Sequence, residues 1–369
     1  MEEEGPDRDA LPRLLSAASR AYGAVMEARA GLYGRGFLRV GRPGVPVVSV
    51  GNITTGGTGK TPLAVRVSQI LRSEGFSPAI LSRGYGGSRE KKGGLVSDGR
   101  TVKLSPAEAG DEPCLMALLL PGVPVAVGRD RMKSAAFCVE RLNADVLILD
   151  DGFQRLSIAR DLDILLADAE KPFGNRRTLP RGPLREPLSH ILRAHALILT
   201  RARPASPPPP EWPENRPVFR AFHRPSGLAT PRFLAAPGVA PPERPLLPLS
   251  ILKGSRVMAF SGIARNEDFF TTLSDLGALV AARMGFPDHH PYGAADMAAI
   301  RENARAARAE IIVTTEKDAV RLGKAELSPG GAGQAAGPPL LALSVEMEIF
   351  EAAGFAAYIV ERVKTAAGA

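Results

Sequence analysis

Short apolar runs alternate with longer mixed segments between residues 45 and 203. The runs are rich in Val, Ile and Leu, as expected of strands buried in a parallel sheet. The expected strands cover residues 45–50, 79–82, 123–127, 146–149, 164–167 and 196–200. Strands separated by helical stretches are typical of a doubly wound parallel sheet, so the predicted fold class is α/β.

The pattern changes after residue 203. The segment PASPPPPEWPENRP is too rich in Pro for a helix or a central strand and predicts a connector. A second Pro-rich stretch covers residues 236–248, and a Gly/Ala-rich stretch at 330–337 predicts a flexible loop. The remaining elements expected here are a strand at 256–260, a helix at 266–276 and strands at 310–315 and 340–344.

The first strand runs into the sequence GNITTGGTGKT, which predicts a phosphate-binding loop. Gly56, Gly57 and Gly59 let the backbone curl with its N–H groups pointing inward, as an anionic phosphate requires. Lys60 supplies a charge for the outer phosphates, and the Thr61 hydroxyl can ligate Mg²⁺. A site for a nucleotide triphosphate is therefore expected.

The match to this loop differs from the usual pattern at one position. Thr54 stands where the usual loop has Gly. Thr55 stands where one subclass, the nucleotide-sandwich dimers, carries a signature Lys, so that subclass is disfavoured. The candidate nucleotide-binding residues are Thr54, Thr55, Gly56, Gly57, Thr58, Gly59, Lys60 and Thr61.

Two adjacent carboxylates end the apolar strand in VLILDDGFQR. Ligands sit at the carboxyl ends of strands in α/β sheets, so Asp150 and Asp151 are expected to face the loop that carries Lys60. Neighbouring carboxylates repel each other unless a cation is present, and Mg²⁺ prefers hard oxygen ligands. Thr61, Asp150 and Asp151 are therefore the candidate metal ligands, and which Asp binds the metal directly stays open.

Charge and composition restrict the partners. The net charge of +8 favours acidic partners such as nucleotides, phospholipid head groups or nucleic acid. Aromatic residues make up 5% of the chain and no nucleic-acid-binding motif is present, so no nucleic acid partner is expected. Cys114 and Cys138 have neither disulfide-framework nor metal-ligand spacing and predict buried cytosolic thiols.

Residues 11–38 combine apolar side chains at near-helical spacing with interleaved arginines. Four glycines weaken any long helix there, and the segment is too polar to span a bilayer. Two interpretations fit: a surface helix packed on the core, or a basic amphipathic segment lying in a membrane interface.

Several shorter motifs indicate a function only weakly when each is considered alone. In GDEP, Asp111 either begins a helix or is a functional carboxylate. In DHH, His289 and a second histidine stand beside an acid. SRGYGG offers Arg83 to a phosphate, and TEKDAV predicts a helix with Thr at its N-cap. The basic segment 174–187 predicts a mobile loop for an anionic substrate or a solvated surface loop.

Together the motifs closely resemble one family, the tetraacyldisaccharide 4'-kinases of lipid A biosynthesis. The resemblance runs from the N-terminal segment to TEKDAV and covers most of the chain. It rests on GNITTGGTGKTP, SRGYGG, GDEP, GRDR, LDDGFQ, LPRGPLREP, FSGIA, DHH and TEKDAV in this order. Thr54 is normal for this family.

The resemblance implies a kinase that uses ATP and Mg²⁺ to phosphorylate the 4'-hydroxyl of an anionic glycolipid, tetraacyldisaccharide 1-phosphate. It implies a peripheral enzyme on the cytoplasmic face of a bacterial inner membrane, in contact with the anionic membrane surface and with no protein partner. Asp111 would be the base, assisted by His289, while Lys60 acts on the phosphoryl group. Arg83 and Arg131 are candidates for phosphate contacts.

Arg155 departs from the family, which has His after LDDGFQ. A guanidinium stays charged and has no acceptor, so Arg155 could contact phosphate but could not act as a base. The rivals are a soluble small-molecule kinase or ligase on the same fold, and a non-enzymatic nucleotide switch.

The chain of 369 residues exceeds what one core usually holds, so two domains are expected. The predicted fold is a P-loop NTPase-like sheet with a second, smaller α/β domain that closes the active-site cleft. The predicted ranges are 1–42 for the amphipathic membrane-associating segment, 43–203 for the nucleotide-binding domain, 204–255 for the Pro-rich connector and 256–369 for the C-terminal domain.

Overall fold

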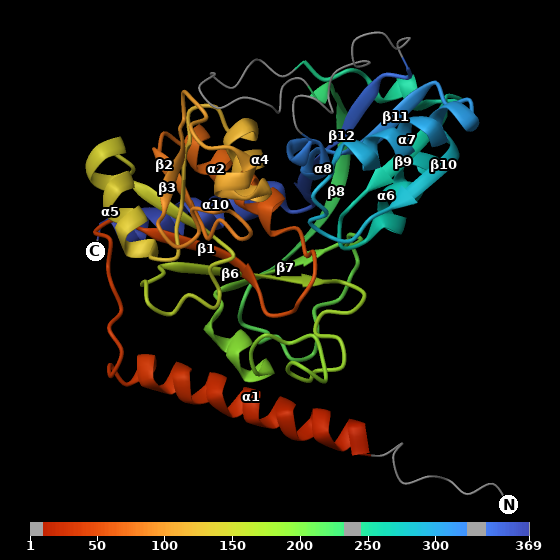
Figure 1. The fold of residues 1–369 in the computed structure, drawn as a ribbon. Helices are drawn as coiled ribbons and strands as arrows, with labels where there is room; N and C mark the ends of the chain where they lie inside the picture. The colour runs from red at the N-terminus through yellow and green to blue at the C-terminus, as the bar shows by residue number, and fades with distance from the viewer. Residues whose placement is uncertain (1–9, 232–244, 323–336, 369) are drawn as a thin grey trace, which may run out of the picture. The chain divides into compact units, whose positions relative to one another are not determined.

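The structure is a computed structural model that describes residues 10–231, 245–322 and 337–368. The chain forms two compact units that interleave along the sequence (Figure 1). Unit 1 comprises residues 1–81, 131–222 and 347–369, and unit 2 comprises residues 82–130 and 223–346. The sequence predicted consecutive ranges instead. The chain passes between the units after residues 81 and 130 and within two long strands, β8 (Val218–Ala229) and β12 (Leu340–Ile349), each of which has residues in both units.

Unit 1 is built on a parallel sheet. Its strands are β1 (Val47–Asn52), β2 (Pro78–Ser82), β5 (Val146–Asp150), β6 (Leu162–Asp168), β7 (Ala196–Thr200) and the start of β8. They are ordered β8-β7-β6-β1-β5-β2, and each neighbouring pair is parallel. The helices are α2 (Lys60–Ser73), α5 (Arg131–Leu142), η1 (Leu188–Arg193) and α10 (Ala352–Ala367). The five strands predicted within this unit are confirmed.

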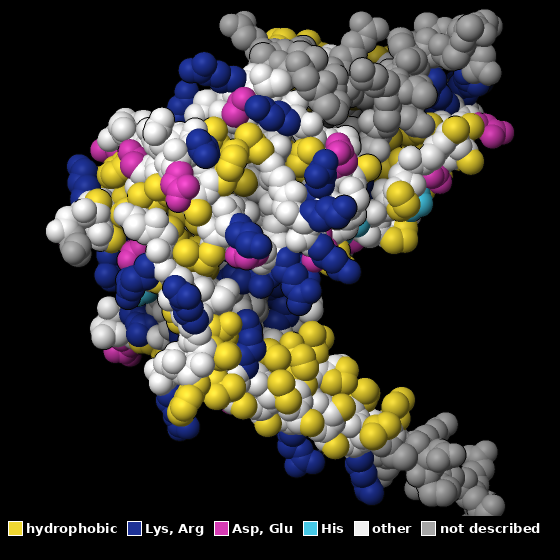
Figure 2. Space-filling view, turned by 60° about the vertical axis from the view of Figure 1, so that its left-hand side comes forward, with side chains coloured by type: hydrophobic (Ala, Val, Ile, Leu, Met, Phe, Trp, Pro, Cys, Tyr) yellow, Lys and Arg dark blue, Asp and Glu magenta, His cyan; other side chains and the backbone are white. Residues whose placement is uncertain are grey.

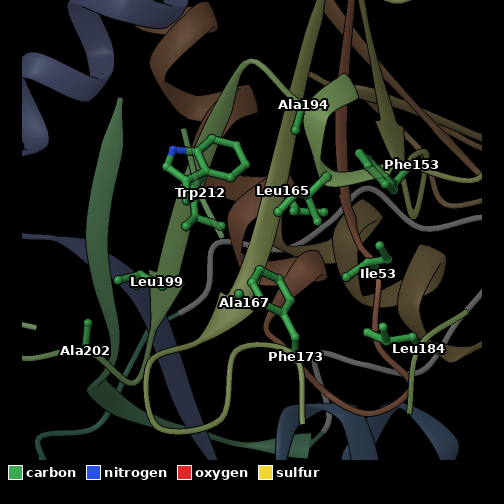
Figure 3. Close-up of a cluster of buried hydrophobic side chains, with 12 residues drawn as sticks. Ile53, Phe153, Leu165, Ala167, Phe173, Leu184, Ala194, Leu199, Ala202 and Trp212 are labelled. Atoms are coloured by element: carbon green, nitrogen blue, oxygen red, sulfur yellow. The ribbon is translucent and has the colours of Figure 1, made fainter. Parts of the chain in front are cut away.

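A hydrophobic cluster beside β6 and β7 lies within unit 1 (Figure 3). It joins Ile53, Phe153 and Leu165 to Trp212, which is 4% exposed. Trp212 comes from residues 204–217, which form neither helix nor strand, as predicted for a connector. The predicted connector range 204–255 needs a correction, however, because it contains β8, whose first residues alternate between partly and fully buried positions.

Unit 2 contains a second parallel arrangement, in the order β10-β9-β11-β12. Its strands are β9 (Arg256–Ser261), β10 (Leu279–Gly285), β11 (Ile311–Thr315) and part of β12, with helices η3 (Leu249–Leu252), α6 (Asn266–Asp275), α7 (Ala294–Ala306) and α8 (Glu316–Arg321). An antiparallel pair, β3 (Gly94–Asp98) and β4 (Pro124–Val127), accompanies α3 (Pro106–Ala109) and α4 (Asp111–Leu119).

The predicted strands at 123–127, 256–260, 310–315 and 340–344 and the helix at 266–276 are confirmed in this unit. The strands β3, β8 and β10 were not predicted. Most of the Pro-rich stretch 236–248 and of the Gly/Ala-rich stretch 330–337 lies outside the described residues.

The N-terminal segment forms one helix, α1 (Ala10–Gly34), although its glycines were expected to weaken a long helix. Tertiary contacts within unit 1 outweigh their low propensity. The Ser19 hydroxyl donates to the Thr178 carbonyl (2.7 Å), and the Tyr22 hydroxyl donates to the Arg185 carbonyl (2.9 Å). The Glu27 carboxylate lies 3.0 Å from the His190 ring.

The outer face of α1 exposes apolar side chains along its length (Figure 2), namely Leu11, Leu14, Val25 and Leu32. No helix in the described ranges combines the length and the apolar composition needed to cross a membrane.

The two cysteines are free and buried, as predicted. Burial raises the pKa of both the Cys114 and the Cys138 thiols to about 12, so they stay protonated and inert at neutral pH.

Candidate active site

The loop after β1 has the backbone geometry that its glycines predict. Gly56 and Gly59 adopt positive φ values of 108° and 84°, a region that residues with a Cβ rarely occupy. Gly59 is the N-cap of α2, and Lys60 is the first helical residue. Backbone N–H groups at such a turn and helix start attract anions.

Asn52, at the end of β1, connects the parts of this loop. Its side chain is fully buried, and its amide donates to the Thr58 hydroxyl at 2.9 Å. Its side-chain oxygen accepts from the Lys60 ammonium at 3.3 Å and from the Arg185 guanidinium. Asn52 therefore fixes the position of the Lys60 ammonium relative to the loop.

Asp151 is the carboxylate that the structure brings to Lys60. It follows β5 with a positive φ of 52°, and its carboxylate lies 3.7 Å from the Lys60 ammonium. The Arg185 guanidinium donates to both of its oxygens, at 3.0 and 2.9 Å. Burial opposes ionisation of Asp151, but Lys60 and Arg185 outweigh it and lower the pKa of this carboxyl to about 2. Asn52, Lys60, Asp151 and Arg185 are called the Lys60 cluster below.

The other predicted metal ligands lie on neighbouring elements. Asp150 is the buried last residue of β5, and Thr61 is the second residue of α2, a helix that packs on β5. In the described parts of the chain, no three His, Cys, Asp or Glu side chains form a group that could hold a metal by themselves.

The three predicted arginines have different surroundings. Arg131 is the buried first residue of α5, and its charge contributes to the low pKa of Asp151, an effect smaller than those of burial, Lys60 and Arg185. Arg83, in unit 2, is ion-paired with Glu90 at 2.7 Å. Arg155 accepts a hydrogen bond from Arg160 through its carbonyl.

The basic segment 174–187 was expected to be a mobile loop or a solvated surface loop. Its backbone is instead hydrogen-bonded to Ile53 and Thr55, at the start of the glycine-rich loop. The Thr55 N–H donates to the Pro183 carbonyl (2.8 Å), and the Arg185 N–H donates to the Ile53 carbonyl (2.7 Å). Arg185 was not among the predicted site residues. The many arginines of this segment indicate that one of them could serve the site, but the composition does not indicate which arginine turns toward the strand ends.

Arg201 is a second residue that the sequence did not indicate. Its guanidinium pairs with Asp168, at the end of β6, at 2.6 Å and donates to the Gly57 carbonyl at 3.1 Å. The ends of β6 and β7 therefore hold the glycine turn of the loop in place.

In unit 2, Asp111 begins α4 and is buried, with 7% of the residue exposed. One oxygen, Oδ1, accepts from the Glu112 N–H at 2.9 Å. The other, Oδ2, lies 3.0 Å from His289 Nδ1 and accepts from Arg321 Nε at 2.9 Å. Burial raises the pKa of Asp111, but His289, Lys317 and Arg321 outweigh it and hold the pKa at about 2.

His289 lies in the loop after β10, in the left-handed region with a φ of 62°. Its other ring nitrogen, Nε2, lies 3.3 Å from the Lys317 ammonium. The Asp111 hydrogen bond raises the pKa of His289, while burial and the Lys317 charge lower it, and the net direction is upward. Asp111, Glu112, Asp288, His289, Lys317 and Arg321 are called the Asp111 cluster below, because Lys317 also lies 3.3 Å from Asp288.

The cluster is held by α8, whose predicted Thr cap is confirmed. The Thr315 hydroxyl accepts from the Asp318 N–H at 3.1 Å. Asp318 is fully buried and accepts from the Gly262 N–H and the Tyr292 hydroxyl, both at 2.9 Å. These bonds set the position of α8, and Lys317 and Arg321 with it.

The two histidines of DHH have separate surroundings. His290 stacks on Phe286 with ring centroids 4.6 Å apart and pairs with Asp296 at 3.2 Å, so it stabilises the start of α7. His289 alone of the two faces Asp111. The pair that the sequence separates by 178 positions is thus brought together within unit 2.

Comparisons with known proteins identify the family. The family model described as tetraacyldisaccharide-1-P 4'-kinase matches residues 11–364. A tetraacyldisaccharide 4'-kinase from Desulfatibacillum aliphaticivorans is 44% identical over 98% of this chain and 95% of its own length. One from Geobacter metallireducens is 44% identical over 84% of this chain and 88% of its own. A crystal structure of LpxK from Aquifex aeolicus in complex with ATP is 33% identical, covers 96% of this chain and 99% of its own, and superposes with a TM-score of 0.75.

Proposed function

The chain belongs to the tetraacyldisaccharide 4'-kinase family of lipid A biosynthesis, and from this premise we propose which of its residues carry out the phosphoryl transfer. The enzyme is a phosphotransferase whose acceptor is the 4'-hydroxyl of tetraacyldisaccharide 1-phosphate. ATP is the donor. We assign the nucleotide to the Lys60 cluster of unit 1 and the proton acceptor to the Asp111 cluster of unit 2.

Residues 54–61 bind the triphosphate. The glycine turn and the start of α2 direct N–H groups and the Lys60 charge to one place, and charge neutralisation dominates catalysis of phosphoryl transfer. Lys60 already contacts one carboxylate and one amide oxygen, so it is held in position before any phosphate arrives.

Thr61, Asp150 and Asp151 fit the requirements of Mg²⁺. They offer hard oxygen donors, and the low pKa of Asp151, which Lys60 and Arg185 impose against burial, keeps that carboxylate ionised. Mg²⁺ is typically held by one or two carboxylates together with substrate phosphates, so a complete protein cage is not required. When bound, the ion would neutralise charge on the phosphates.

The proposal rests on the Asp111 carboxylate, because its two oxygens differ in how many further hydrogen bonds each can accept. Oδ2 already has two neighbouring donors, whereas Oδ1 accepts one hydrogen bond, from the Glu112 N–H. A carboxylate oxygen has two lone pairs, so Oδ1 can accept the sugar hydroxyl. As the bond from the γ-phosphorus to the ADP oxygen breaks and the bond to the 4'-oxygen forms, the hydroxyl proton moves to Asp111. His289 and Arg321 orient the carboxylate.

Arginines complement the anionic substrates. The charge of Arg131 lowers the pKa of Asp151 in the Lys60 cluster, so Arg131 suits a nucleotide phosphate. The exposed Arg83 suits the anionic glycolipid. Arg155 is a further candidate for phosphate contact.

Helix α1 lies on the cytoplasmic face of the bacterial inner membrane as a peripheral anchor. Exposed apolar side chains alternate along it with the exposed Arg13 and Arg20, the combination that binds anionic bilayer interfaces. This contact would present the enzyme to its lipid-embedded acceptor.

The test is transfer of radiolabelled phosphate from ATP to tetraacyldisaccharide 1-phosphate in mixed micelles. Asp111→Asn keeps the size of the side chain and removes the base, so transfer should fall by about 10³-fold. Asp98→Asn is the matched control, because Asp98 is a half-buried carboxylate of the same unit that pairs with Lys103 outside the Asp111 cluster. A folded Asp111→Asn enzyme with the turnover of the control would refute the assignment.

A further inference from the structure

Lys317 occupies an unusual position at the Asp111 cluster, where it has one acceptor for each of its three N–H groups. Its ammonium lies 3.0 Å from Glu112 Oε1, 3.3 Å from Asp288 Oδ1 and 3.3 Å from His289 Nε2. Its side chain is 21% exposed, so most of its solvation comes from these three groups. Nothing in the proposed transfer uses it directly.

The chemistry of the ammonium decides the protonation of the ring beside it. A lysine ammonium has three donors and no acceptor, so the ring nitrogen that faces it has to present a lone pair. His289 Nε2 is therefore unprotonated in this arrangement, and the ring proton is on Nδ1. Nδ1 lies 3.0 Å from Asp111 Oδ2 and donates to it.

We propose that Lys317 is a positioning residue that holds His289 as the neutral ring protonated at Nδ1, directed at Asp111. This inference rests on the proposed role of Asp111 as the proton acceptor. The neutral ring fixes the Asp111 carboxylate by a hydrogen bond without placing a full positive charge beside it. Oδ1 then remains a better acceptor for the substrate hydroxyl than it would be next to an imidazolium.

The charged groups that face His289 explain why a cation is needed there. Asp111 contacts one ring nitrogen and Asp288 lies 3.8 Å from the other, while Glu112 is held by the same Lys317. Arg321 is paired with the same Asp111 oxygen, Oδ2, that the ring contacts, and the exposed Tyr85 ring lies edge-on at 6.0 Å.

Without Lys317, His289 would have carboxylates on both sides and would take up a second proton. The predicted consequence is an acid limb of the pH–rate profile that moves to higher pH. A move of one pH unit lowers turnover about tenfold at pH values below the limb.

The experiment combines nitrogen NMR of the histidine rings with pH–rate profiles of the full-length enzyme. The chain has five histidines, so the His289 signals are identified by their loss in His289→Gln. The variants are Lys317→Met, which keeps the length of the side chain without its charge, and Lys317→Arg, which keeps charge and donors. Lys103→Met is the matched control, because Lys103 pairs with Asp98 on the surface of the same unit.

The wild-type spectrum at pH 8 should show His289 as the neutral ring with its proton on Nδ1, and this readout needs no variant to fold. Lys317→Met should move the protonation of His289 and the acid limb upward together by about one pH unit. Lys317→Arg should show a smaller shift, and Lys103→Met none. A wild-type ring protonated at Nε2, or a Lys317→Met enzyme with unshifted signals, would overturn the proposal. If the NMR shift occurs while the pH–rate profile stays unchanged, Lys317 sets the tautomer as proposed, and the role of Asp111 in transfer is what fails.

Discussion

The Lys60 cluster and the Asp111 cluster use the same kinds of side chain in opposite proportions. In unit 1, two cations, Lys60 and Arg185, share the single carboxylate of Asp151. In unit 2, the carboxylates of Asp111, Glu112 and Asp288 share the cations Lys317 and Arg321. Positive charge is in excess in the first group and negative charge in the second.

This difference matches the two tasks of a kinase. Excess cations suit a polyanionic nucleotide, because the positive potential of Lys60 and Arg185, which stabilises the Asp151 carboxylate, also attracts phosphate groups when the ligand binds. A surplus of carboxylates suits the acceptance of a proton, provided that cations keep the acceptor ionised and oriented. Burial opposes the ionisation of Asp111, but His289, Lys317 and Arg321 outweigh it and hold the pKa at about 2, which is consistent with this condition.

The largest predicted effect comes from removing the proposed proton acceptor. Asp111→Asn should lower turnover about 10³-fold, within the range that general bases contribute. His289→Ala should also lower turnover, and the double variant should cost less than the product of the two single losses, because the groups act as a unit. Steady-state kinetics at saturating ATP measure this, and strictly multiplicative losses would argue that the two residues act independently.

Removing the central cation of the other cluster should have the next largest effect. Lys60→Ala deletes a charge that stabilises the transferring phosphoryl group, so turnover should fall about 10²-fold. Lys171→Ala, an exposed lysine of unit 1, is the control and should behave as wild type. Wild-type turnover in a folded Lys60→Ala enzyme would remove the assignment of the nucleotide to unit 1.

Sequence patterns were informative about the two clusters to different degrees. The glycines, Lys60 and the Asp pair lie on one strand–loop–helix unit and its parallel neighbour, so local rules predict their proximity. Asp111 and His289 were selected through the family resemblance. Lys317 lies in the TEKDAV motif, whose residues predicted only a helix start, and Arg321 directly follows that motif.

What the sequence missed depends on contacts between distant segments. Arg185 turns toward Asp151 because its backbone pairs with Ile53, and no periodicity encodes that pairing. Strand β8 follows a Pro-rich stretch and was taken as connector, and α1 persists as a helix despite its glycines because its side chains bond to the segment 174–187.

Acid should destabilise the fold partly through Asp111. The folded pKa of about 2, held down by His289, Lys317 and Arg321 against burial, lies below the unfolded value near 3.9. This carboxylate therefore contributes stability above about pH 4, roughly 2 kcal/mol, which is lost as the pH falls toward 2. Urea unfolding of wild type and Asp111→Asn between pH 6 and pH 2 should show a smaller loss in the variant. Parallel curves would contradict the ionised, paired state of Asp111.

The smallest effect concerns α1, which lies outside both clusters. Leu11→Glu combined with Leu14→Glu places acidic groups on its exposed apolar face. Sedimentation with anionic liposomes should fall about tenfold, since lost burial and charge repulsion act in the same direction. Leu279→Glu, an equally exposed leucine of β10, is the control. Equal liposome binding by all three proteins would favour the interpretation of α1 as a surface helix.

ATP affinity, measured by calorimetry with a non-hydrolysable analogue and Mg²⁺, separates the two clusters most directly. Lys60→Ala should weaken binding at least tenfold, the cost of about one charged hydrogen bond, whereas Asp111→Asn should bind within about threefold of wild type. This contrast is expected if the nucleotide binds in unit 1 and the proton acceptor lies in unit 2. An Asp111→Asn enzyme that loses as much ATP affinity as Lys60→Ala would contradict it.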